Sequence, residues 1–154
     1  MERNNKENMI DRLYVLELRT PNHYYVGTTS REIFDLPDGH AHGARLLEHE
    51  NGEGSRFSQK HGFAKCLLHA VVPSEMATTL EDDLTRYLMA RYGWQQARGG
   101  RYVRVRDDDE TYWLPREFRE GSFRDILKLR TGTVSKFPAE LRGLVDRFCA
   151  VCGS

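Results

Sequence analysis

The sequence predicts a mixed α/β fold, in which a small three-stranded antiparallel sheet is flanked by helices and followed by a C-terminal helical extension. Two short runs rich in tyrosine, valine and leucine, at 13–18 and 23–28, lie on either side of a Pro-Asn turn. A third apolar run, at 65–72, has the length of a buried strand. A long segment with helical spacing of its apolar residues follows it directly. The 154 residues fit one domain of ordinary size.

The first two strands are expected to form an antiparallel hairpin. Side chains alternate between the two faces of a strand, so Tyr14, Leu16 and Leu18 should share one face. By the same rule, Tyr25 shares a face with Gly27 in the second strand. A plain hairpin needs neither tyrosine, and the pair is therefore a candidate functional feature.

A short helix is predicted at 43–50, after a segment that reads as a loop. That segment, REIFDLPDGHAHG, contains a Pro-Asp-Gly turn and no sustained period, which is typical of a loop or an insertion. Within the helix, Arg45 and His49 are one turn apart and project together. The NGEGS segment ends the helix, because asparagine and glycine commonly terminate helices.

The helix predicted at 75–92 has the clearest periodic pattern in the chain. Ser74 is its candidate N-cap, and a glycine marks its end. On a helical wheel of about 100° per residue, Glu81 and Asp83 fall at opposite edges of the apolar stripe, and Asp82 points outward. Spacing alone leaves both Glu81 and Asp83 as candidates for a functional carboxylate.

The last third of the chain is predicted to extend the core. Residues 97–106 read as a glycine turn into an extended segment that carries four arginines. An acidic run then marks a break in composition, which divides the chain into a core at 1–106 and an extension at 107–154. Apolar residues within 137–148 follow a helical period. We expect this extension to pack on or beside the core.

Composition limits the classes of function. The 23 basic side chains balance the 23 acidic ones, so any nucleic-acid binding must come from a local cluster of positive charge. No apolar run approaches the ~20 residues that a membrane span needs, and the first residues are polar. Three cysteines do not form a secreted disulfide framework, and Cys66 reads as a small core residue. We expect a soluble, cytoplasmic protein with no membrane partner.

The CAVCG segment, which holds Cys149 and Cys152, resembles half of a zinc knuckle. Structural zinc sites use four ligands, so this one needs histidines such as His40 and His42, or the same two cysteines from a second chain. The alternative is two free thiols near a helix end, and we favour that interpretation.

Five features occur in an order that resembles the GIY-YIG nuclease family. LYV stands where GIY would be and YVG where YIG would be, which brings in Tyr14 and Tyr25. The RLLEH pattern supplies Arg45 and His49, and Glu81 follows in the long helix. EGSRFSQKHG precedes the third strand, and YGWQQARGGRY follows the long helix. The resemblance covers most of the predicted core and leaves the last third of the chain outside it.

The resemblance implies a metal-dependent endonuclease that hydrolyses DNA phosphodiester bonds, in which Tyr14 takes the proton from water, directly or through a relay. A phenol has an ordinary pKa of ~10, so Tyr14 needs Tyr25, Arg45 or His49 close by to favour its phenolate. Arg45 offers a planar fork for phosphate oxygens. Glu81 is the implied ligand of one divalent cation, Mg²⁺ or Mn²⁺, which suits the pentavalent phosphate and the leaving 3′ oxygen.

Contacts with the DNA are expected from four basic residues, Lys60, Arg98, Arg101 and Arg104. The alternative function is a catalytically silent nucleic-acid-binding or protein-binding module that retains the GIY-YIG fold. Two departures from the family pattern support that alternative. LYV lacks the glycine and isoleucine of the motif, and Gln95 and Gln96 stand where many relatives have an asparagine.

Overall fold

The computed structural model of the protein describes residues 9–100, 102 and 139–152. The main sheet consists of four strands, β1 (Ile10–Leu18), β2 (Tyr24–Thr29), β5 (Phe63–Pro73) and β6 (Ala97–Gly99). A separate two-stranded sheet pairs β3 (Phe34–Asp35) with β4 (Ala41–His42). The helices are α1 (Ala44–Glu50), α2 (Arg56–His61), α3 (Ser74–Tyr92) and α6 (Ala139–Cys152), with a 3-10 turn, η2 (Trp94–Gln96). The predicted mixed α/β class is confirmed.

The hairpin of β1 and β2 sets the register of the candidate site. The strands pair antiparallel, with Tyr14 opposite Gly27 and Leu16 opposite Tyr25. Tyr14, Leu16 and Tyr25 pack in one apolar cluster, as the alternation predicts. On its other side, β1 pairs antiparallel with β5, so β1 lies within the sheet and Tyr14 is held by neighbours on both sides.

The sheet has one strand more than predicted, and its order is β5-β1-β2-β6. β6 pairs parallel with β2, so the sheet is mixed rather than purely antiparallel. The glycines at 99 and 100 predict a turn that leads into an extended segment, whereas the strand already begins at Ala97 and ends at Gly99. A Cβ atom at Gly99 would lie 2.4 Å from the backbone oxygen of Val26, so the glycine permits the close approach that ends the strand.

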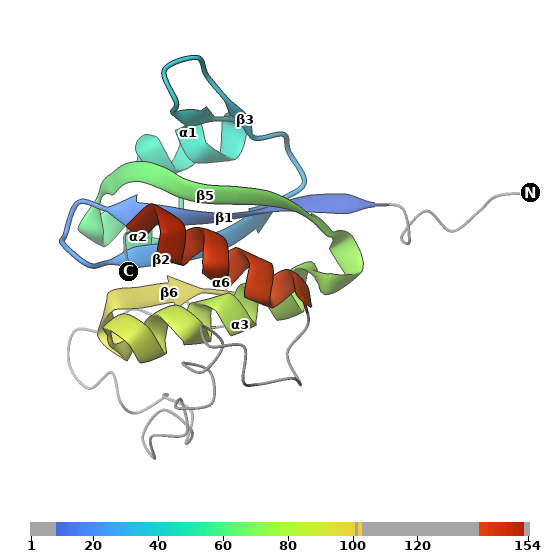
Figure 1. Ribbon diagram of the computed structural model, residues 1–154. Coiled ribbons are helices and arrows are strands. Elements are labelled where there is room, and N and C mark those ends of the chain that lie inside the picture. Colours follow the sequence, from blue (N-terminus) through green and yellow to red (C-terminus); the bar gives the residue numbers. More distant parts are fainter. Residues whose placement is uncertain (1–8, 101, 103–138, 153–154) are drawn as a thin grey trace, which may run out of the picture.

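Two layers of helices cover the two faces of the sheet (Figure 1). Helices α3 and α6 pack on one face, and α1 and α2 pack on the other, which carries Tyr14. Within α6, the buried side chains are those predicted by its helical period: Leu141, Leu144, Val145 and Phe148. The C-terminal helix is thus part of the main apolar core.

Three local expectations differ from the structure. The segment read as a loop contains β3 and β4, and a helix that was not predicted, α2, precedes β5. The N-cap of α3 is Pro73 and not Ser74, whose side chain makes no capping bond. Asp82 is 8% exposed rather than outward-pointing. Its carboxylate fits beside Gly100, where a Cβ atom would lie 2.0 Å from Asp82 Oδ1.

The described helices include none that is both long and apolar enough to cross a membrane. Two clefts, of about 260 and 320 Å³, border β5 and share Asp38, His40, Lys65 and Cys66 in their walls. None of the residues that line them belongs to the polar cluster around Tyr14.

Candidate functional site

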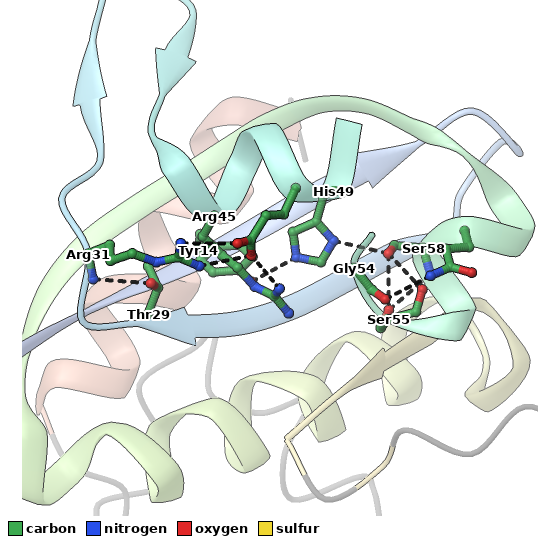
Figure 2. Close-up of polar contacts among 10 residues, drawn as sticks. Tyr14, Thr29, Arg31, Arg45, His49, Gly54, Ser55 and Ser58 are labelled. Atoms are coloured by element: carbon green, nitrogen blue, oxygen red, sulfur yellow. Dashed lines mark hydrogen bonds and ion pairs between the residues drawn. The ribbon is translucent and has the colours of Figure 1, made fainter. Parts of the chain in front are cut away.

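The Tyr14 side chain is the centre of a buried polar cluster. It lies on β1 with only 1% of its surface exposed. Its hydroxyl is 2.9 Å from His49 Nε2, and Arg45 Nε donates a hydrogen bond to the same oxygen at 3.3 Å. Arg45 and His49 are one turn apart on α1, as predicted, and both contact this phenol. Figure 2 shows the polar contacts that continue from this centre in both directions.

Ser58 determines which ring nitrogen of His49 carries the proton. Its single hydroxyl hydrogen is donated to the backbone oxygen of Ser55 at 3.0 Å. Ser58 Oγ can therefore only accept at its 3.0 Å contact with His49 Nδ1, which assigns the proton to Nδ1. In a neutral imidazole, Nε2 is then an acceptor, and the Tyr14 hydroxyl donates to it.

Ser58 is itself held by the first turn of α2. Ser55 is the N-cap of this helix, and its side chain accepts a hydrogen bond from the Ser58 N–H at 3.0 Å. The hydroxyl of Ser55 donates to Ser58 Oγ at 3.1 Å. Ser58 is 1% exposed, so its orientation is fixed by both hydrogen bonding and packing. The unpredicted helix thus supplies the orientation of His49.

Glu48 joins the cluster from the same helix as His49. Its carboxylate accepts from Arg45 Nη1 at 2.8 Å and from both terminal nitrogens of Arg31, at 2.8 and 3.0 Å. These two guanidinium groups hold the pKa of Glu48 at about 2, well below its ordinary value. Arg45 therefore contacts Tyr14 through Nε and the Glu48 carboxylate through Nη1.

Tyr25 and Gly54 complete the surroundings of His49. The Tyr25 ring centroid is 5.3 Å from that of His49, and its hydroxyl interacts with Ser55 and Arg45. A Cβ atom at Gly54 would lie 2.1 Å from His49 Nδ1, so the loop can approach the imidazole only with glycine at this position. His49 is 2% exposed as a result of this enclosure.

Glu81 is the carboxylate of α3 that acts on the tyrosines. Burial is the main cause of the raised pKa values of Tyr25 and Tyr14, and the charge of Glu81 contributes to both. Burial and the neighbouring Asp82 raise the pKa of Glu81 itself to about 7, against a hydrogen bond from the Gly100 backbone that lowers it. Asp83, the other candidate from spacing, instead forms an ion pair with Arg86 at 2.8 Å.

Burial dominates the electrostatics of the central pair. It raises the pKa of Tyr14 above its ordinary value, with a further contribution from Tyr25, and the nearby Arg45 opposes this without outweighing it. It also lowers the pKa of His49 to about 4, and Arg45 adds to that effect. At neutral pH the free protein therefore holds a neutral phenol against a neutral imidazole. The nearby Arg45 therefore does not favour the phenolate enough to produce it at neutral pH.

The residues predicted to contact DNA are placed differently from one another. Lys60 is exposed on α2. Arg98 is 1% exposed, lies over the Phe57 ring at 5.2 Å and donates to the backbone oxygen of Ala97 at 2.8 Å, so its side chain is internal. Arg101 and Arg104 lie outside the described residues. Internal placement of Arg98 does not suit a contact with a phosphate backbone.

Possible metal ligands are sparse in the described part of the chain. It contains no group of three or more histidine, cysteine, aspartate or glutamate side chains arranged to hold an ion. Glu81 offers one carboxylate, and burial disfavours its charged form. A single carboxylate ligand suits one hard divalent cation that keeps most of its water.

Sequence reasoning missed the residues that orient the cluster, namely Glu48, Gly54, Ser55 and Ser58. The serines had a usable signal, because Ser55 directly precedes the new helix and is a favoured N-cap residue. The role of Ser58 towards His49 depends on a contact across the fold and carries no local signal.

Comparisons of the chain with protein-family models, with curated proteins and with solved structures found no match.

Proposed function

We propose that the protein is a metal-dependent endonuclease that hydrolyses DNA phosphodiester bonds with a site of the GIY-YIG type. The observation that carries this proposal is the Tyr14 hydroxyl, which lies between His49 Nε2 at 2.9 Å and Arg45 Nε at 3.3 Å. A tyrosine that served packing alone would not need a buried histidine whose tautomer is set by a serine. This arrangement supports a proton relay instead.

The relay follows from the lone pairs of the Tyr14 oxygen. One lone pair accepts from Arg45, and the second can accept a proton from water. As the water oxygen bonds to phosphorus, its proton passes to Tyr14 and the phenolic proton passes to His49 Nε2. The P–O3′ bond breaks, and the 3′ oxygen leaves with the electron pair and takes a proton from solvent. His49 then carries the positive charge, and its Nδ1–H remains bonded to Ser58 Oγ.

The free protein is not poised to ionise Tyr14. Burial raises the pKa of Tyr14 and lowers that of His49 to about 4, so the proton stays on the phenol. The Arg45 side chain is 27% exposed. Of Tyr14 and Arg45, Arg45 is therefore the residue that an entering phosphate can reach. Because Tyr14 itself is buried, the attacking water must arrive with the substrate. Activity therefore depends on charges that the substrate and a cation bring to the site.

Glu81 would hold that cation, which when bound supplies Lewis-acid stabilisation for the phosphate oxygens and the leaving 3′ oxygen. A carboxylate binds a metal ion only when it is deprotonated. The pKa of Glu81 is about 7, so Glu81 changes between its protonated and deprotonated forms near neutral pH. The charge of Glu81 contributes to the raised pKa values of both tyrosines, which supports assigning it to the same site.

The test is a cleavage assay with plasmid and single-stranded DNA in Mg²⁺ or Mn²⁺. Glu81→Gln should abolish cleavage and leave DNA binding unchanged or slightly tighter, because a negative charge facing phosphate is removed. Asp83→Asn is the matched control, since the same carboxylate-to-amide change falls two residues away on a side chain paired with Arg86. Cleavage by Glu81→Gln at the wild-type rate would refute the assignment of Glu81.

A catalytically silent nucleic-acid-binding module is the second candidate. The observation that favours it is the burial of Tyr14, which keeps the phenol protonated. The two candidates differ in the wild-type protein. A silent module binds DNA and leaves it intact with every divalent cation, whereas the endonuclease nicks or cuts it in a cation-dependent way.

A further inference from the structure

A second polar cluster lies between α3 and α6, with its centre at Cys149. The hydroxyl of Tyr87 is 3.3 Å from Cys149 Sγ, and Arg91 Nη1 donates to the same sulfur at 3.3 Å. Arg91 Nη1 also donates to the Tyr87 oxygen at 3.2 Å, which directs the Tyr87 hydrogen towards the sulfur. The two cysteines of α6 are free thiols and are half-buried.

The guanidinium of Arg91 is held in place by aromatic rings. It lies 5.1 Å from the Tyr92 ring centroid and 5.6 Å from that of Phe148. Such contacts favour a cation that is partly removed from water. A fixed cation beside a sulfur atom is the setting that stabilises a thiolate, and the thiolate is the nucleophilic form of cysteine. The same cation opposes a divalent metal at this sulfur.

We propose that Cys149 is a reactive thiolate that, together with Cys152, forms a dithiol site for hydroperoxides. The proposal does not rest on the proposed nuclease function: the cluster lies on the face of the sheet opposite Tyr14, although α3 carries both Arg91 and Glu81. Two donors, one of them charged, converge on Cys149 Sγ. The charged and titratable groups that act on the second thiol, Cys152, are Arg91, Tyr92, Glu17 and Cys149.

Cys152 is suited to resolve the oxidised form of Cys149. It follows three residues later, so the two side chains share one side of α6. Cβ atoms at this spacing on a helix are about 5–6 Å apart. A disulfide needs about 3.5–4.5 Å. Because Cys152 is the last residue of α6, only the final helical turn has to open for the bond to form.

The reaction balances with the hydroperoxide as the oxidant. The Cys149 thiolate attacks the distal peroxide oxygen, the O–O bond breaks, and the leaving alkoxide or hydroxide takes a proton from solvent. Cys149 becomes a sulfenic acid. The Cys152 sulfur then attacks the Cys149 sulfur, a disulfide forms, and the hydroxyl group leaves as water with the proton of Cys152.

Cys66 is a matched internal control in the same chain. It is also half-buried, but its thiol donates to the backbone oxygen of Leu68 at 3.3 Å, whereas the sulfur of Cys149 accepts from Arg91. Burial raises the pKa of Cys66 to about 11. Arg91 donates a hydrogen bond to the Cys149 sulfur, whereas the Cys66 thiol is itself the donor to a backbone oxygen, so the two thiols should differ measurably in reaction rate.

The experiment treats the full-length native protein with a limiting amount of iodoacetamide and maps labelled peptides by mass spectrometry. Cys149 should be alkylated at least about tenfold faster than Cys66 at pH 7.5. Arg91→Gln should remove most of this difference, and Arg147→Gln, on the same helix as Cys149, should preserve it. Equal rates for Cys149 and Cys66 in the wild-type protein overturn the proposal without any variant, so loss of folding cannot obscure the result.

Hydrogen peroxide then tests the role of Cys152. In the wild-type protein a Cys149–Cys152 disulfide should form, with Cys66 still reduced. In Cys152→Ser the reaction should stop at a sulfenic acid on Cys149, which a 1,3-diketone reagent traps. Oxidation that begins at Cys66, or no sulfenic acid in Cys152→Ser, contradicts the assignment. Bound zinc that protects both cysteines from alkylation would also contradict it.

Discussion

Gly27 lies directly across the β1–β2 ladder from Tyr14, and a Cβ atom at position 27 would meet the Tyr14 hydroxyl oxygen at 2.4 Å. The phenol therefore lies over its partner strand in space that only glycine leaves open. The hydroxyl reaches His49 and Arg45 because of this opening. The relation gives the YVG motif a steric meaning that does not depend on any family.

Gly27→Ala should displace the Tyr14 hydroxyl and lower both stability and cleavage. Overpacking of a filled interior costs about 1–3 kcal/mol, and the buried ring has little room to move. Gly143→Ala is the matched control, because nothing lies within 4 Å of a Cβ at that position on α6. That control should gain about 0.5–1 kcal/mol in the free energy of unfolding. Urea unfolding of both variants measures the difference, and equal stabilities would contradict the crowding at Gly27.

Ser58→Ala should impair cleavage through His49. The change removes the acceptor of the Nδ1–H, so the imidazole loses the bond that fixes its tautomer and orientation. Losses from such supporting partners are typically about tenfold to a hundredfold. Ser74→Ala is a suitable control, since this buried hydroxyl has no hydrogen-bond partner among the described residues. A shifted pH–rate profile in Ser58→Ala, absent in Ser74→Ala, separates the effect on the tautomer from a general loss of folding.

Tyr14→Phe should eliminate cleavage while the protein stays folded. The ring keeps its packing, but His49 Nε2 and Arg45 Nε lose their shared partner, which costs about 1–3 kcal/mol of stability. Tyr24→Phe is the matched control. Tyr24 is next to Tyr25 in β2 but lies on the opposite face of the sheet, so the loss of its buried hydroxyl should leave cleavage normal. Circular dichroism confirms folding and single-turnover rates compare activity. Substantial cleavage by Tyr14→Phe would exclude the proton relay.

The contribution of His49 to stability should fall as the pH is lowered from 6.5 towards 4. His61, whose pKa burial also lowers to about 4, acts in the same direction, and Glu81, whose pKa burial raises to about 7, acts in the opposite direction. Burial lowers the pKa of His49 in the folded protein to about 4, against about 6.5 in the unfolded chain. The unfolded state thus binds a proton more readily, and the contribution of neutral His49 is complete above pH 6.5 and is lost towards pH 4. The loss amounts to at most about 3.5 kcal/mol. The measurement is the difference between His49→Gln and the wild-type protein in the slope of unfolding free energy against pH between 7 and 5, because the contributions of His61 and Glu81 are common to both. The variant should lose the part of the slope that His49 supplies, and an identical slope would disprove this origin.

Short-range patterns predicted those parts of the site that short-range geometry determines. The alternation along β1 placed Tyr14 and Leu16 on one face, and helical spacing placed Arg45 beside His49. The choice between Glu81 and Asp83 was not accessible, because it depends on where α3 lies against the sheet. Both fall at an edge of the same stripe, and only contacts across the fold distinguish them.

Other misses share this cause. β6 pairs with β2 across about seventy intervening residues, a separation over which no local pattern carries information. Arg98 reads as a surface cation by residue type, yet its guanidinium packs over Phe57 from a helix that was itself not predicted. Asp82 is enclosed because Gly100 leaves space beside its carboxylate, which a helical wheel cannot represent.

The two ion pairs of Glu48, with Arg31 and Arg45, affect how Arg45 would bind a phosphate. Arg45 already has an anionic partner in Glu48, at 2.8 Å, and Glu48 is shared with Arg31. A DNA phosphate that reaches Arg45 therefore replaces or shares an internal counterion instead of displacing a mobile salt ion. The affinity gained at this arginine should depend only weakly on salt concentration, unlike that of a freely solvated cation on a nucleic-acid surface. Under the proposed function, Glu48 should make Arg45 a weak contact for the phosphate, and tight DNA binding would have to come from contacts elsewhere along the strand.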